Sequence, residues 1–241
     1  MRPLTADQLL EVWENTWNKS PLERSIHLIN AASSHSDLNR IAHYSIGERD
    51  ARLLLLRKWM FGNRLSNLSN CPSCAEKVEW EMNVEEISLQ NLREGTNKEV
   101  FELDHDDFQI KYRLINSLDM LNKNFTDARS LINNCIVEVR KGNEEFEKVD
   151  LPDTIYSAIE REMYQADPQA HIGISLDCPS CEHAWSASFS IMQYIWIEIE
   201  VWAKHLLRDI YLIAKNFGWS ERDILNMNPN RRQLYLQMID K

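Results

Sequence analysis

Apolar residues recur at helical spacing through the first seventy residues, and each run follows a residue that can cap a helix. Thr5 and Gln8 have the spacing of a capping box, in which each side chain bonds the backbone N–H of the other residue. A similar box starts at Ser20, and a further helix starts at Ser45 and ends at Gly62. The pattern therefore predicts three N-terminal helices.

The third of these helices is rich in charge as well as in leucine. Charged side chains usually face water, so we interpret these as a solvated face, with a docking surface for a partner as the alternative. They are Glu48, Arg49, Asp50, Arg52, Arg57 and Lys58.

The middle of the chain alternates apolar and polar residues in short runs, which is typical of strands. Helical spacing and a Pro152-Asp153 start signal interrupt this pattern. The predicted elements are a hairpin over 100–103 and 108–114, helices over about 127–139 and 152–165, a strand over 172–176, and a polar loop with one helical turn over 84–99.

The longest apolar stripe lies between Ser190 and Gly218, and its members are three or four residues apart, which predicts one helix of roughly 28 residues and about 40 Å. Trp196 and Val201 lie off the stripe, so this helix should be covered on two sides, by the N-terminal helices or by another subunit. Two short helices are expected after it. The stripe is Ile191, Ile195, Ile199, Trp202, Leu206, Ile210, Ile213 and Phe217.

Two copies of Cys-Pro-Ser-Cys give the chain its clearest chemistry. Cys71 and Cys74 form one pair, Cys178 and Cys181 the other, and a strand-like stretch follows each pair. Four thiolates on two tight turns are the full ligand set of a structural Zn²⁺. About a hundred residues separate the pairs, so we predict one zinc ribbon with a small module inserted into it.

Other uses of these cysteines stay open at this level. Disulfides are disfavoured because the chain begins without an apolar secretory stretch, and a redox pair would need a following helix. Two separate metal sites, a metal shared between chains, or replacement of one thiolate by His183 are further alternatives. Cys135 lies in an apolar run and is expected to be an inert buried thiol.

The predicted fold is therefore mainly α with a small β portion: a helical bundle plus a Cys₄ zinc ribbon split by an inserted hairpin-and-helix module. The predicted domains are an N-terminal helical region (1–66), the split ribbon with its α+β insert (67–190), and a C-terminal helical region (191–241) that packs on the N-terminal helices.

Composition bounds the function. A chain of 241 residues, 44% of them hydrophobic, can bury a core in one large or two small domains, and no apolar run reaches membrane-spanning length. The net charge is −10, and residues 71–190 carry 24 acidic but only 11 basic side chains. That acidic middle disfavours nucleic-acid binding, which depends on Lys and Arg.

The sequence offers little for catalysis. It contains no phosphate-binding glycine loop, no glycine-flanked nucleophilic serine and no His-Glu-x-x-His. Asp104, His105, Asp106 and Asp107 could bind a cation, but consecutive side chains rarely converge on one ion, so we interpret them as a polar turn. A hydrolase that uses the acidic insert has no motif behind it. We predict that the protein is not an enzyme.

Several motifs occur together in this order along the chain. They are Arg2-Pro3-Leu4-Thr5, Gly47-Glu48-Arg49-Asp50, Phe61-Gly62, the two Cys-Pro-Ser-Cys turns with His183 and Trp185, Ala166 to Ala170, Tyr194 to Ile199 with Trp202-Ala203, Phe217 to Glu221, and Arg231-Arg232. With these motifs the chain resembles baseplate proteins of T4-like phages called baseplate hub assembly chaperones, with relatives in gene clusters for phage-tail-like contractile injection systems. Ala75 and Glu182 depart from the glycine that often follows the second cysteine of a ribbon knuckle.

The resemblance implies a non-enzymatic assembly factor or structural component of a baseplate hub. Its partners would be hub or wedge proteins of a contractile tail, and it would act in the bacterial or phage-infected cytoplasm or enter the tail particle. The alternative is a zinc-ribbon regulator that binds nucleic acid through Arg222, Arg231 and Arg232.

Overall fold

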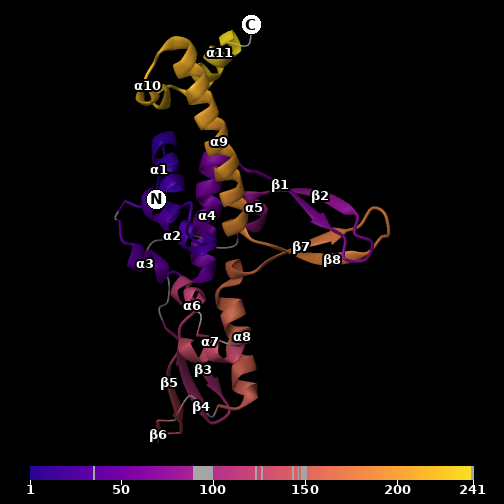
Figure 1. Ribbon diagram of the computed structural model, residues 1–241. Helices are drawn as coiled ribbons and strands as arrows, with labels where there is room; N and C mark the ends of the chain where they lie inside the picture. Colours follow the sequence, from indigo (N-terminus) through magenta and orange to yellow (C-terminus); the bar gives the residue numbers. More distant parts are fainter. Residues whose placement is uncertain are drawn as a thin grey trace. The chain divides into compact units, whose positions relative to one another are not determined.

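The computed structural model in Figure 1 describes residues 1–34, 36–88, 100–122, 124–125, 127–142, 144–145, 147 and 151–239. Over these residues the protein is mainly helical, with three small antiparallel sheets, which confirms the predicted fold class. Its contacts divide the chain into two units. The first contains residues 1–36 and 192–241, and the second contains residues 37–191.

The first unit is made of helices from both ends of the chain. Side chains of α1, α9, α10 and α11 share one apolar cluster, to which α1 contributes Leu10 and α10 contributes Ile224. Both predicted N-terminal capping boxes are present, at Thr5–Gln8 and Ser20–Glu23. The helices are α1 (Ala6–Thr16), α2 (Pro21–Ala32), α9 (Ile191–Phe217), α10 (Glu221–Leu225) and α11 (Pro229–Ile239).

The second unit contains α4 (Ile46–Phe61), preceded by the short α3 (Leu38–Ala42). Ser45 caps α4 as predicted, and its side chain accepts from the backbone N–H of Glu48 at 3.1 Å. Gly62 ends the helix with a φ of 91°, a conformation that favours glycine.

The predicted solvated face of α4 is wrong for most of its members. Glu48, Arg49, Asp50 and Arg57 are each at most 9% exposed. Arg49 Nε donates to Asp50 Oδ1 at 2.8 Å, and Arg52 Nη2 donates to Glu48 Oε1 at 2.6 Å. Burial raises the pKa of the Asp50 carboxyl, although Arg49 acts against that effect. Charge pairing within the helix makes burial tolerable, because a paired buried ion costs far less than a lone one.

The start of α4 packs tightly against a 3₁₀ turn, η2 (Pro168–Ala170). The Gly47 N–H donates to Asp167 Oδ2 at 2.9 Å, inside the protein. A Cβ on residue 47 would lie only 2.0 Å from Asp167 Oδ1 and 2.9 Å from the Ala170 nitrogen. Only glycine fits at residue 47, because any side chain would overlap Asp167.

The insert combines a four-stranded sheet with helices on a shared core (Figure 1). The sheet order is β3-β4-β5-β6, and each neighbouring pair is antiparallel. The predicted hairpin is confirmed as β3 and β4, and the predicted helix 152–165 as α8. The elements are β3 (Phe101–His105), β4 (Phe108–Tyr112), α6 (Ser117–Leu121), α7 (Ala128–Cys135), β5 (Ile136–Lys141), β6 (Glu144–Glu145) and α8 (Asp153–Ala166).

The structure differs from the predicted helix 127–139 and describes only part of the segment predicted over 84–99. The predicted helix 127–139 is wrong in its second half, because α7 ends at Cys135 and the chain continues as β5. Ile136, Val137 and Val139 are β-branched and fit a pleated strand that pairs with β4. The predicted helical turn after residue 84 is α5 (Val84–Ile87), whereas the loop expected over 89–99 lies outside the described residues.

A buried carboxylate joins the elements of the insert. Arg113 donates through both Nη atoms to the carboxylate of Asp119, at 2.6 and 2.8 Å. The Asn116 backbone N–H and the Asn134 amide donate to the same carboxylate at 2.9 and 2.6 Å. Burial alone would raise the pKa of Asp119, but the hydrogen bonds from Arg113 and Asn116 outweigh it, so the pKa is lowered.

Candidate metal centre

Two β-hairpins carry the cysteine turns at their tips (Figure 1). Inward-facing side chains of the two hairpins meet, because the Trp80 and Phe189 rings lie 6.1 Å apart edge to face. Val78 and Trp185 pack with Cys71 and Cys178 at the tips. The hairpins are β1 (Arg64–Asn70) with β2 (Lys77–Asn83), and β7 (Ile172–Asp177) with β8 (Ala184–Phe189).

The two cysteine turns have the same backbone geometry. The Cys71 N–H donates to the Glu76 carbonyl at 2.8 Å, and the Cys178 N–H donates to the His183 carbonyl at 3.0 Å. The residue after each second cysteine is left-handed, with φ of 60° at Ala75 and 58° at Glu182. Both turns therefore adopt a conformation that favours glycine, at the two positions where this sequence lacks it.

The fold brings the four cysteines of the two turns together. Cys71 Sγ lies 3.7 Å from Cys181 Sγ, and Cys74 Sγ lies 3.5 Å from Cys178 Sγ. All four sulfurs lie within 4.8 Å of one another. Sulfurs at Zn–S distances of 2.3 Å on a tetrahedron would be about 3.8 Å apart. The four side chains could therefore hold one metal ion within a single chain.

The electrostatics of the cluster also suit a cation. Burial would raise the pKa of the Cys71 thiol, but the N–H groups of Cys74 and Ser73 donate toward its sulfur and lower the pKa to about 7. The Glu76 N–H lowers the pKa of the Cys74 thiol, but the neighbouring sulfurs, Cys181 first, raise it to about 12. Thiolates this close oppose one another's ionisation, and a divalent cation between them would remove that repulsion.

Two other candidate residues, His183 and Cys135, do not belong to the sulfur cluster. The His183 ring stacks on Trp185 with a centroid distance of 6.3 Å, and the converging group consists of the four thiols without this histidine. Cys135 is fully buried, as predicted, in the core of the insert, and burial raises the pKa of its thiol to about 12.

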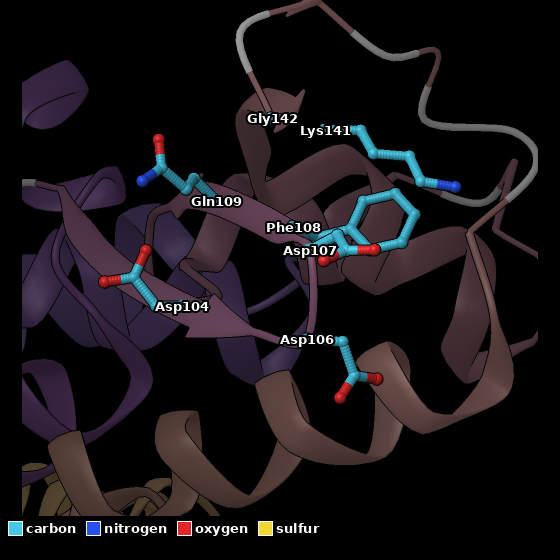
Figure 2. A pocket seen from close by; sticks show the side chains of 7 residues that line it. All are labelled: Asp104, Asp106, Asp107, Phe108, Gln109, Lys141 and Gly142. Atoms are coloured by element: carbon cyan, nitrogen blue, oxygen red, sulfur yellow. The ribbon is translucent and has the colours of Figure 1, made fainter.

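The tip of the β3–β4 hairpin borders an open hollow of about 460 Å³ (Figure 2). Its lining includes Asp104, Asp106 and Asp107, together with Lys141, whose ammonium lies 5.2 Å from the Phe108 ring centroid. The Asp104 and Asp106 carboxyl groups point in different directions in Figure 2. Among the described residues, these acids do not form a group that could hold a metal ion. A polar turn is the simpler account of them.

The arginines that a nucleic-acid-binding regulator would use, Arg222, Arg231 and Arg232, are not all exposed to solvent. Arg232 is only 6% exposed, so its guanidinium cannot act as a free phosphate contact. Arg231 donates to the Tyr235 hydroxyl at 3.3 Å and lies over that ring. In the part of the chain that the structure describes, no helix has both the length and the apolar character to cross a membrane.

Fold and site together define a mainly helical protein with an interrupted cysteine ribbon that could hold a metal ion. The sequence model of the T4 bacteriophage base plate protein family matches residues 6–193. The chain belongs to this family, as the resemblance implied, and a structural or assembly role in a phage baseplate follows from membership. No curated protein and no solved structure matches the chain.

Proposed function

We propose that this protein is a non-enzymatic assembly factor or structural component of the baseplate hub in a contractile phage tail or phage-tail-like injection system. The observation that carries the proposal is the family match over residues 6–193. Its partners are other baseplate proteins, of the hub or the wedges. It acts in the cytoplasm of the cell that makes the particle and can enter the tail.

We further propose that Cys71, Cys74, Cys178 and Cys181 bind one structural Zn²⁺. Their sulfur separations of 3.5 and 3.7 Å support a tetrahedral site. Four protein ligands leave no open position for water or substrate, so such a metal would stabilise the ribbon and perform no chemistry.

The metal is tested by elemental analysis of the natively purified protein. We expect about one zinc per chain, and a Cys74→Ser variant should lose most of it. Cys135→Ser is the matched control, because this fifth cysteine lies outside the cluster and should leave the zinc content unchanged. Absence of zinc from a native protein whose five thiols are all free would refute the zinc proposal and leave the baseplate role untouched.

The proposed mechanism is the shielding of a partner's interface. Large apolar side chains lie exposed on or next to several helices, among them Trp17 just after α1 at 70% and Trp59 on α4 at 40%. Such surfaces can cover a partner's apolar interface until the correct neighbour replaces them. In a phage or gene cluster lacking this gene, we expect particles with defective baseplates by electron microscopy, and normal particles after complementation. Normal assembly without the gene would contradict the proposed role.

The acidic tip of the insert is the surface we propose for steering partners. Asp106→Lys with Asp107→Lys should weaken association with baseplate proteins, because complementary charge speeds protein encounters. Glu11→Lys with Glu14→Lys on α1 is the control, since both glutamates are exposed but lie in the first unit. If both double variants retain the same baseplate proteins in pull-downs at low and at physiological salt, the interface lies elsewhere.

A further inference from the structure

Helix α11 has an inverted pattern of burial. The buried residue of this helix is Arg232, which is only 6% exposed. By contrast, Leu234 is 56% exposed and Met238 is 62% exposed on the same helix. A surface helix normally buries its apolar side chains and keeps its charges in water. The orientation of α11 on the protein therefore does not make full use of its own apolar residues.

Arg232 is poorly satisfied where it lies. Its Nε is 4.0 Å from Asp209 Oδ2 on α9, which is beyond hydrogen-bond distance. Nε and Nη1 are both buried, and no acceptor for either lies among the described residues. Burial lowers the pKa of the Arg232 guanidinium, in line with a charge held away from water. Each buried donor without an acceptor opposes the docking of α11.

Asp209 has positively charged neighbours besides Arg232 of α11. Burial raises the pKa of this carboxyl, and Arg232, His205 and Arg208 act in the opposite direction. Arg208 and His205 lie on α9 itself and are exposed. If α11 left, Asp209 would keep these neighbours, whereas Arg232 would regain water. Release of α11 would therefore return the Arg232 guanidinium to water and leave the Asp209 carboxylate with cationic neighbours.

The strip of α9 that shares a core with α11 suits a helix. Ala203, Leu206, Ile210 and Ile213 recur three or four residues apart along α9 and belong to one apolar cluster, to which α1 and α10 also contribute Leu10 and Ile224. Tyr235, Leu236 and Ile239 of α11 pack against that cluster but are only partly buried. Helix α11 is also held by aromatic contacts, because the centroid of the Tyr235 ring lies 4.7 Å from that of Trp219 and 5.5 Å from that of Phe217.

We propose that α11 is a weakly held cover over one part of this cluster, and that the α9 surface it would uncover, beside α1 and α10, is a docking surface for an amphipathic helix of a partner protein. That helix would place an apolar side chain where α11 places Arg232. The present occupant is a helix, which argues for a helical replacement, and an apolar strip offers nothing to a polyanion. A second copy of the chain would bring the same arginine to the same place and gain nothing. The strip lies beyond residue 193, outside the family match, so the inference does not depend on the baseplate role.

Peptide binding to the unaltered full-length protein tests the strip directly. The probes are labelled synthetic peptides of residues 228–239: the natural sequence, an Arg232→Leu version, and an Arg231→Leu version as the matched control. By fluorescence anisotropy, the Arg232→Leu peptide should bind about tenfold more tightly than the natural one, because it buries no unpaired donor. The Arg231→Leu peptide should behave like the natural one, since Arg231 is exposed.

Hydrogen exchange on full-length variants gives the second test. Arg232→Leu should slow exchange of the α11 amides and weaken binding of the Leu peptide, because the protein's own cover is then held more firmly. Arg231→Leu should change neither. Faster α11 exchange in Arg232→Leu would show that the arginine anchors the helix and would overturn the proposal. Equal affinity of the three peptides would also overturn the proposal. If the protein is a dimer that the peptide dissociates, a second copy of the chain occupies the strip, and our choice of partner is refuted.

Discussion

The left-handed residues of the two cysteine turns allow a quantitative prediction. Ala75 and Glu182 have φ of 60° and 58°, where a side chain meets the following carbonyl oxygen. That conformation costs a residue with a Cβ about 1–2 kcal/mol. Glycine avoids this cost but loses about 0.5–1 kcal/mol through the greater freedom of the unfolded chain. We therefore expect each substitution to glycine to stabilise the protein, although glycine usually destabilises.

The expected gain is about 0.5–1 kcal/mol for Ala75→Gly and about 1–2 kcal/mol for both turns together. Ala75→Gly isolates the backbone effect, since it changes no charge, whereas Glu182→Gly also removes a carboxylate beside the thiols. The measurement is urea unfolding at a fixed free zinc concentration, with a rise of the midpoint at unchanged slope. In a zinc-competition assay the glycine variants should also bind metal more tightly, because the relaxed turns favour the bound form.

Glu76→Gly is the matched control, because this neighbouring residue does not have a positive φ. It should lose about 0.5–1 kcal/mol, the usual penalty for glycine in an ordinary conformation. If Ala75→Gly also lowers the midpoint, by as much as Glu76→Gly does, the turn holds no strain at residue 75 and the reasoning is refuted.

Three further predictions concern the rest of the second unit. Gly47→Ala should lower the free energy of unfolding by roughly 2–5 kcal/mol in urea, because the added methyl group overpacks the site and a buried hydrogen bond is lost. Adding Asp167→Ala should recover part of that loss, because it removes the side chain that the methyl group would meet. If the effects of the two substitutions on stability simply add, residues 47 and 167 are not in close contact and the reasoning is refuted. Metal removal by a chelator should raise hydrogen exchange in both hairpins while far-UV circular dichroism keeps most of its helical signal, whereas a global loss of helix would show that the ribbon supports the whole protein. Because the pKa of Asp119 is lowered in the fold, its contribution is complete above the unfolded pKa of about 3.9 and disappears as pH falls through the folded value, so Asp119→Asn should flatten the acid limb of the stability curve. An acid limb as steep in Asp119→Asn as in the natural protein would assign the pH dependence to other groups.

Local signals made much of the fold predictable. A capping box or a cysteine turn involves residues only a few positions apart, so Thr5, Ser20 and the two Cys-Pro-Ser-Cys sequences point to their structures without knowledge of the rest of the chain. The same holds for the long helix α9, whose stripe extends over many turns. The pairing of the two cysteine turns needed one further step, namely that four thiols complete one tetrahedral site.

The features that escaped prediction depend on partners distant in the sequence. The charges at the start of α4 look solvated in the sequence, but they are buried in the fold, where Arg49 Nη1 lies 3.5 Å from the Ser117 hydroxyl, 68 residues further along the chain. Strand β1 (Arg64–Asn70) is largely polar, and it is a strand because β2 pairs with it. Arg232 gives no hint of burial in its local pattern. Tertiary packing overrides local preference in all three cases.

The hundred-residue interval between the two cysteine turns also has a consequence for the timing of synthesis. A ribosome adds about 5–20 residues per second, so the second turn emerges roughly 5–20 s after the first. Until then the first turn offers only two thiols, and its hairpin has no facing sheet. The residues that form the core of the insert lie between the two turns in the sequence, so their contacts can form during that delay. Completion of the sulfur cluster would then report that everything between Cys74 and Cys178 has been made and has brought its two ends together.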